Sequence, residues 1–227
     1  MPERSYYHAY DDRYKQVHGR GLQWFSAMPS PIVAETIREF SILPGQHKLL
    51  EIGCGEGRDA FPLLEEGFDL LATDISPAAV DFCRNRRPDH AGSFRVLDCV
   101  TENLPDRFDL IYAVAVVHML VPDEDRDAFY RFVREHLTPS GIGLICTMGD
   151  GSFERQSDIS TAFDLQDRVH EQTGTPVRIA GTSCRMVSFD TFERELARNG
   201  LRVVRKGITA VEPDFPEMMF AAVRKEK

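Results

Sequence analysis

The 227-residue chain is long enough for one α/β domain with a well-buried core. Its 27 basic and 36 acidic residues give a formal net charge of -9 at pH 7, which disfavours nucleic acid as a partner because phosphate binding requires a basic face. The sequence shows no signal peptide and no apolar run long enough to span a bilayer, and its five cysteines lack metal-ligand spacing. We therefore expect a cytoplasmic protein without a metal or a membrane contact.

The N-terminal part combines an aromatic segment with a helix. Residues 1–28 hold many aromatic but few aliphatic side chains, so they are poorly suited to build a core and should cover another surface. The alternative is an ordered helix that packs its aromatic residues on the outside of the domain. Ser30 as N-cap, Pro31 in the first turn and apolar residues at helical spacing then predict a helix that ends near residues 43–45.

The most informative stretch is a glycine turn that follows the first predicted strand, residues 48–52. Three glycines stand at alternate positions: Gly53, Gly55 and Gly57. Glycine allows positive φ and close approach of the backbone to a ligand, and the predicted helix over residues 56–66 would point free N–H groups at it. A dinucleotide-binding turn requires glycine where Arg58 stands, and a P-loop requires Gly-Lys-Ser/Thr, so neither pattern fits.

With Glu51 two residues before the first glycine, this turn resembles the first motif of class I S-adenosylmethionine-dependent methyltransferases. The resemblance implies S-adenosyl-L-methionine as cofactor and a three-layer αβα sandwich, with a mostly parallel seven-stranded Rossmann-like sheet whose last strand is antiparallel. It also implies cofactor contacts from the turn: Glu51, Gly53, Cys54, Gly55 and Arg58. Because the first segment of many such enzymes is a lid, we expect residues 1–28 to form one over a methyltransferase domain, residues 29–227.

A second acidic position follows the next predicted strand. Residues 68–73 are predicted to form a buried strand that ends at Asp74, and Ser76 then caps a helix that starts at Pro77. We expect Asp74 and the following Ile75 to contact the cofactor. A carboxylate at the tip of the second parallel strand can accept both hydroxyls of a ribose. Asp74 could instead act only as a second cap for the helix.

Two further strands complete the cofactor side. The first covers residues 93–97 and the second is the longest apolar run, residues 108–118, as expected for a strand buried on both faces. The resemblance assigns cofactor contacts to their ends: Asp98, Cys99, Ala113 and Val114. The resemblance implies that Asp98 accepts a hydrogen bond from the adenine amino group. A solvated turn would have the same sequence at Asp98. The resemblance also implies that His118 faces the substrate.

The rest of the chain returns to the βα pattern after one interruption. Residues 149–187 are polar and interrupt the alternation of strands and helices, so we expect a substrate-side insertion there. It contains a short helical pattern at 163–170. The other predicted elements are a helix at 123–137, a turn at 138–141, a strand at 143–148, a helix at 189–198 capped by Ser188, and strands at 201–210 and 218–224.

These features predict in-line methyl transfer to a small-molecule acceptor. The chain most resembles the tellurite-resistance and thiopurine methyltransferases. We expect it to be a monomer or a homodimer. Displacement at an activated sulfonium requires positioning more than a dedicated base, and no catalytic triad or metal cluster is visible. We expect His118 and Tyr14 to be the catalytic residues. Other candidate bases are Tyr10, His18 and Asp150. The alternatives are a methyltransferase for tRNA or protein, and a nucleotide-binding protein without methyl transfer.

Overall fold

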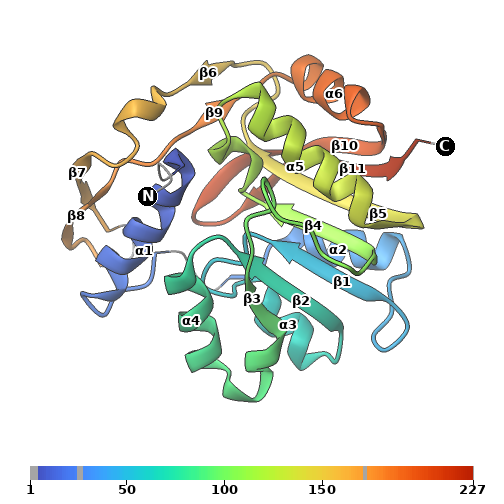
Figure 1. The fold of residues 1–227 in the computed structure, drawn as a ribbon, viewed down its shortest axis with the longest axis horizontal. Helices are drawn as coiled ribbons and strands as arrows, with labels where there is room; N and C mark the ends of the chain where they lie inside the picture. The colour runs from blue at the N-terminus through green and yellow to red at the C-terminus, as the bar shows by residue number, and fades with distance from the viewer. Residues whose placement is uncertain (1–4, 25–27, 171–172, 227) are drawn as a thin grey trace.

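The structure, a computed structural model, describes residues 5–24, 28–170 and 173–226 and confirms the α/β sandwich (Figure 1). Its central sheet has seven strands in the order β10-β11-β5-β4-β1-β2-β3. These strands are β1 (Lys48–Ile52), β2 (Asp69–Asp74), β3 (Phe94–Val96), β4 (Phe108–Val114), β5 (Leu137–Met148), β10 (Leu201–Val211) and β11 (Phe215–Lys225). The α-helices are α1 (Ala9–His18), α2 (Pro31–Glu39), α3 (Ala60–Glu65), α4 (Pro77–Arg86), α5 (Asp123–His136) and α6 (Phe189–Arg198).

The strand directions match the expected pattern. The pairs β1–β2, β1–β4, β2–β3 and β4–β5 are parallel, whereas β11 runs antiparallel to both β5 and β10. The last strand is therefore the antiparallel one, as predicted. Parallel neighbours deliver their carboxyl ends to one edge of the sheet, and residues that follow these strands meet there.

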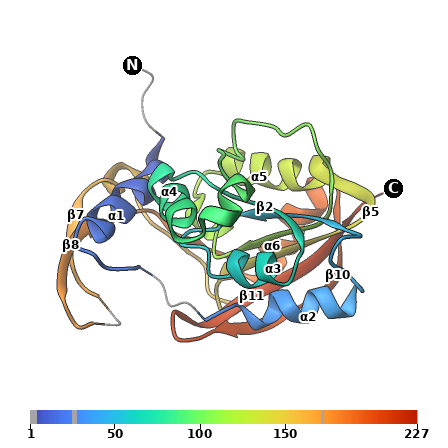
Figure 2. The same cartoon turned by 90° about the horizontal axis from the view of Figure 1, so that it is seen from below.

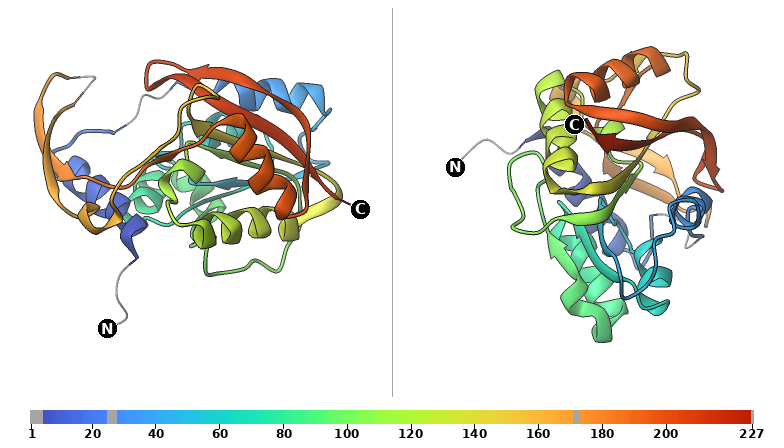
Figure 3. Two further views of the ribbon diagram at one scale, coloured as in Figure 1. Left: turned by 90° about the horizontal axis from the view of Figure 1, so that it is seen from above. Right: turned by 90° about the vertical axis from the view of Figure 1, so that its right-hand side faces the viewer.

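Two apolar layers lie on the two faces of the sheet. Leu49 of β1 packs in one layer with α2, α3 and α4, while its neighbour Leu50 packs in the other layer with α5 and α6. Figures 2 and 3 show α2 and α5 on opposite sides of the strands. Successive side chains of a strand point to opposite faces, so an apolar strand supplies both layers.

The N-terminal helix and the insertion lie together at one end of the molecule. The insertion contains the short strands β6 (Arg155–Gln156), β7 (Leu165–Val169), β8 (Pro176–Ala180) and β9 (Arg185–Met186). Outside the insertion, the 3-10 turns are η1 (Tyr6–His8), η2 (Pro88–Ser93) and η3 (Val117–Met119). Figures 1 and 2 show α1 beside β8, where Val17 packs against Val177 and Ile179. This contact ties residues of the predicted lid to the predicted insertion.

Several local predictions were wrong. The helical pattern at 163–170 is the strand β7, because antiparallel pairing with β8 and not the local preference decides its conformation. The helix predicted from residue 56 starts only at Ala60, since Gly57, at φ +81°, keeps the preceding residues in a turn. The predicted turn at 138–141 is part of β5, where Leu137 pairs with Phe108.

The three predicted N-cap serines behave differently from one another. Ser76 and Ser188 accept hydrogen bonds from the N–H groups of Ala79 and Thr191, as expected. Ser30 stands at the start of α2 but makes no such bond, and its hydroxyl donates to Asp59 at 2.8 Å instead. Of the helices in the described part of the chain, none combines the length and the apolar character that crossing a bilayer requires.

Candidate active site

A cavity opens at the carboxyl ends of β1, β2 and β4 and is covered by residues of η1 and α1. Eleven predicted site residues line it: Tyr14, Glu51, Gly53, Cys54, Gly55, Arg58, Asp74, Ile75, Asp98, Cys99 and Val114. Ala113 does not line it, and its buried side chain packs in the same apolar layer as Leu50. Sequence positions far apart therefore converge where parallel strands end.

The glycine turn has the backbone conformation that its sequence predicts. Gly53, Gly55 and Gly57 have φ values of +75°, +51° and +81°, a region that side chains rarely allow. The N–H of Gly53 donates to the Thr73 carbonyl oxygen at 2.7 Å, which fixes the turn against β2. The φ values alone thus explain why glycine occupies these positions.

Protein side chains take the space beside all three glycines, so it is not left open for a ligand; at Gly57 a Cβ would lie 2.5 Å from Cζ of Phe61. A Cβ at Gly53 would lie 2.3 Å from Cγ2 of Val116, and a Cβ at Gly55 would lie 2.7 Å from the Tyr14 hydroxyl. Tyr14 comes from α1 and is buried, and burial, with the negative charges of Asp74 and Glu56, raises the pKa of its hydroxyl well above the usual value. The Tyr14 hydroxyl thus stays protonated at neutral pH and can donate a hydrogen bond.

Asp74 links the second strand to the glycine turn. Its two carboxylate oxygens accept the N–H groups of Gly55 and Ser76, each at 2.8 Å, so Asp74 supports both the turn and the start of α4. Burial raises the pKa of this carboxyl to about 6, against the lowering effect of those hydrogen bonds. Each oxygen retains a lone pair, which leaves room for a diol as a further donor.

Glu51 and Arg58 bring opposite charges to the cavity. Glu51 is buried and accepts a hydrogen bond from the Tyr112 hydroxyl at 3.1 Å, and burial with the nearby Asp59 raises the pKa of its carboxyl well above the usual value. Arg58 pairs with Asp59 and with Asp214, each at 3.6 Å. A cationic ligand group beside Glu51 would lower that pKa again and stabilise the ionised form.

The third strand ends where the N-terminal segment crosses the site. Asp98 accepts the N–H of Val100 at 2.9 Å and the hydroxyl of Tyr7 at 3.1 Å. Cys99 lines the same cavity, and burial raises the pKa of its thiol, so the thiol stays protonated. Tyr7 is a lining residue that the sequence patterns did not single out.

His118 lies next to this cavity, in a second and larger chamber of about 390 Å³. Tyr10, Met119 and Phe215 line both spaces, so the two are adjacent. His118 is 4% exposed, and its Nδ1 atom has no hydrogen-bond partner among the described residues. Burial, with the charge of Arg126, lowers the pKa of the imidazole to about 3, so the ring is neutral at physiological pH.

The other candidate bases are engaged elsewhere. The Tyr10 hydroxyl donates to the Ser183 carbonyl oxygen at 2.9 Å, and His18 contacts Glu56 at 2.8 Å. Asp150 accepts N–H groups within its own loop and lines neither space. Within the described ranges, no three His, Cys, Asp or Glu side chains are grouped so as to hold a metal ion.

Comparison with known proteins relates the chain to one enzyme family. Residues 50–142 match a family model described as a methyltransferase domain. The tRNA N(3)-cytidine methyltransferase METTL6 of Mus musculus is 37% identical over 31% of this chain and 29% of its own length. The cypemycin N-terminal methyltransferase of a Streptomyces species is 27% identical over 47% and 44% of the two chains. The chain thus spans less than half of either relative.

The fold of nearly the whole chain resembles that of a solved structure. An S-adenosylmethionine-dependent methyltransferase from Clostridium acetobutylicum superimposes with a TM-score of 0.66 at 16% identity, over 94% of this chain and 96% of the other. At that identity the likeness concerns the fold. It includes the parts of the chain outside the matched residues 50–142.

Proposed function

Because the chain belongs to the class I S-adenosylmethionine-dependent methyltransferases, with residues 50–142 matching their domain model, we propose that it transfers a methyl group to a small-molecule acceptor. The cofactor supplies an activated sulfonium methyl group. The protein's task is then to bind, orient and exclude water, which a covered cavity at the strand ends suits.

The cavity has suitable groups for each part of the cofactor. Asp74, whose oxygens keep free lone pairs beside two backbone bonds, would accept the ribose hydroxyls. Asp98 would accept the adenine amino group, beside Cys99. Glu51 and Arg58 would hold the ammonium and carboxylate of the amino-acid part, because their charges are opposite to those of the ligand.

On the acceptor side, we assign His118 to the substrate. Its neutral ring and unpartnered Nδ1 make it suited to form a hydrogen bond with the acceptor and so to orient it. Tyr14, which stays protonated, would donate a hydrogen bond and cover the glycine turn. Residues 1–28 would act as the lid and residues 149–187 as the substrate-side insertion, since both line the second chamber.

The observation that carries this proposal is the carboxylate of Asp74 at the tip of β2, bonded to the glycine turn. Calorimetric titration with S-adenosylhomocysteine and with NAD tests it. We expect binding of the first and not of the second. Asp74→Ala should weaken binding by about tenfold or more, about 1.4 kcal/mol. Asp69→Ala, at the exposed start of the same strand, is the matched control and should leave affinity unchanged. Binding of NAD alone would overturn the proposal.

A tRNA acceptor is the second candidate, and the match to a tRNA methyltransferase favours it. Phosphate neutralisation makes such binding strongly salt-dependent. Titration of the protein with bulk tRNA at several salt concentrations separates the two candidates. We expect no salt-dependent binding, because the net charge is -9.

A further inference from the structure

The second chamber is locally basic although the chain as a whole is acidic. Three guanidinium groups line it: Arg13, Arg155 and Arg168. None of the three makes an ion pair within the described part of the chain. The acid among the described lining residues is Asp214, which pairs with Arg58 at 3.6 Å. The chamber therefore has an excess of positive charge, and its walls concentrate that field.

Arg13 is held in place by the insertion. Its Nε and Nη2 atoms donate to the carbonyl oxygens of Ala180 and Gly181, and Nη2 also donates to the Thr182 hydroxyl at 2.7 Å. Burial and the like charge of Arg168 lower the pKa of the guanidinium. Its Nη1 atom makes no hydrogen bond within the described residues, so a donor remains for a ligand.

Aromatic side chains lie beside these charges. Trp24 and Tyr10 have their rings 4.8 and 5.4 Å from the guanidinium carbon of Arg13. Phe215 meets His118 edge to face at 6.4 Å between ring centroids. The chamber therefore offers apolar faces and cationic donors together, a combination that suits a ligand with an apolar body and a charged end.

The buried and unpartnered Nδ1 of His118 in the same chamber is an independent sign of a ligand, because buried polar atoms normally have a partner. We propose that the chamber binds an aromatic small molecule through an anionic group of carboxylate or phosphate type, held by Arg13, Arg155 and Arg168. Guanidinium groups bind such oxygens in bidentate geometry. Only the identification of this molecule as the methyl acceptor depends on the proposed function.

The test uses the full chain saturated with S-adenosylhomocysteine and calorimetric titration with benzoate, phenylacetate, indoleacetate and phenyl phosphate. The amide of each carboxylate is its neutral control. We expect at least one anion to bind about tenfold or more tighter than its neutral counterpart. Arg155→Ala/Arg168→Ala should remove that preference, since both side chains are exposed and make no ion pair. Arg178→Ala, an exposed arginine of β8 that does not line the chamber, should preserve it.

The results separate this inference from the proposed function. If S-adenosylhomocysteine binds equally to every variant but no anion is preferred, the inference is wrong and the proposed function stands. If anions bind with the expected preference but S-adenosylhomocysteine does not bind, the chamber is confirmed and the proposed function fails. Binding of bulk tRNA that is lost in Arg155→Ala/Arg168→Ala, without binding of the small anions, would also overturn the inference.

Discussion

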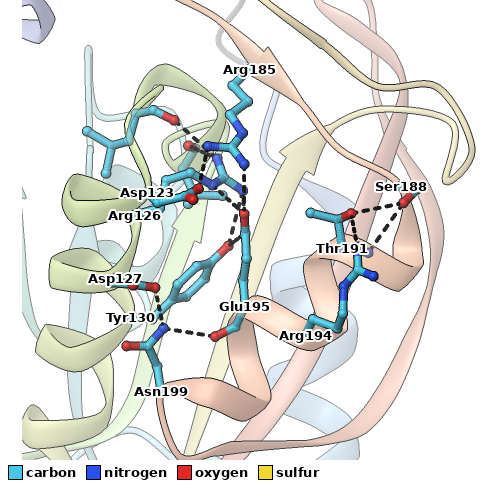
Figure 4. A network of polar contacts seen from close by, with 12 residues as sticks. Asp123, Arg126, Asp127, Tyr130, Arg185, Ser188, Thr191, Arg194, Glu195 and Asn199 are labelled. Atoms are coloured by element: carbon cyan, nitrogen blue, oxygen red, sulfur yellow. Dashed lines mark hydrogen bonds and ion pairs between the residues drawn. The ribbon is translucent and has the colours of Figure 1, made fainter.

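A buried ion pair joins α5 to α6 and supports the turn that carries His118 (Figure 4). Arg126 is 0% exposed and donates to both carboxylate oxygens of Glu195, at 2.9 and 2.6 Å. It also donates to the Val117 carbonyl oxygen at 2.8 Å, in η3. Tyr130 donates to Glu195 at 2.8 Å. Glu195→Gln keeps the shape of this side chain but removes the charge that balances a buried guanidinium.

The size of the expected loss in folding stability follows from the burial of this ion pair. Removing one partner of a buried pair typically destabilises a protein by about 3–5 kcal/mol, because the other charge is left without compensation. In a chain of this size about 1 kcal/mol corresponds to about 2–4 °C, so the melting temperature should fall by about 6–20 °C. Arg185, 3.7 Å from Glu195, loses the same partner and adds to the effect.

Equilibrium urea unfolding of the wild-type chain and of Glu195→Gln measures this loss directly. The matched control is Glu135→Gln, which removes an exposed partner of Arg134 and should cost less than about 1 kcal/mol. Because Glu195 orients the Arg126 side chain that donates to η3, we also expect methyl transfer to fall more than cofactor affinity. Similar losses of stability in the two variants would show that burial does not make the Arg126–Glu195 pair more important than an exposed one.

Three further predictions concern the cavity. Gly55→Ala should weaken binding of S-adenosylhomocysteine, since its Cβ would meet the Tyr14 hydroxyl at 2.7 Å. The control is Gly67→Ala: Gly67 also has a positive φ, +83°, but in the described part of the chain no atom beyond its neighbours lies within 4 Å of the added Cβ, so only stability should change. The pKa of Asp74 is raised to about 6, so its carboxylate is lost as the pH falls through that value. Affinity for S-adenosylhomocysteine should therefore decrease from about pH 7 to about pH 5, and Asp74→Asn should flatten this dependence. His118→Asn should lower kcat by about tenfold or more with unchanged cofactor affinity, and an unchanged kcat would remove His118 from the mechanism.

The convergence of these strand-end residues on one cavity was predictable because its signals are local. Gly53, Gly55 and Asp74 lie at the ends of short apolar strands, and parallel strands place such ends together without further information. Val114 lines the cavity and its neighbour Ala113 does not, because consecutive residues of a strand face opposite sides and the apolar run of β4 does not indicate which side each faces.

The cover of the first cavity and the second chamber depend on long-range contacts that no local pattern indicates. Arg13 meets Ala180 across 167 positions of the chain, and Tyr7 meets Asp98 across 91. The strand β7 forms only because β8 pairs with it, so its own sequence misleadingly indicates a helix. The polar character of residues 149–187 was visible, but the position of its arginines beside the aromatic residues of α1 was not.

A crystal structure with S-adenosylhomocysteine would show whether the carboxyl ends of β1, β2, β3 and β4 bind the cofactor. We predict the ribose hydroxyls within about 3.2 Å of the Asp74 carboxylate and the adenine amino group at Asp98. Density for the compound elsewhere, with Asp74 bound only to the N–H groups of Gly55 and Ser76, would contradict the account.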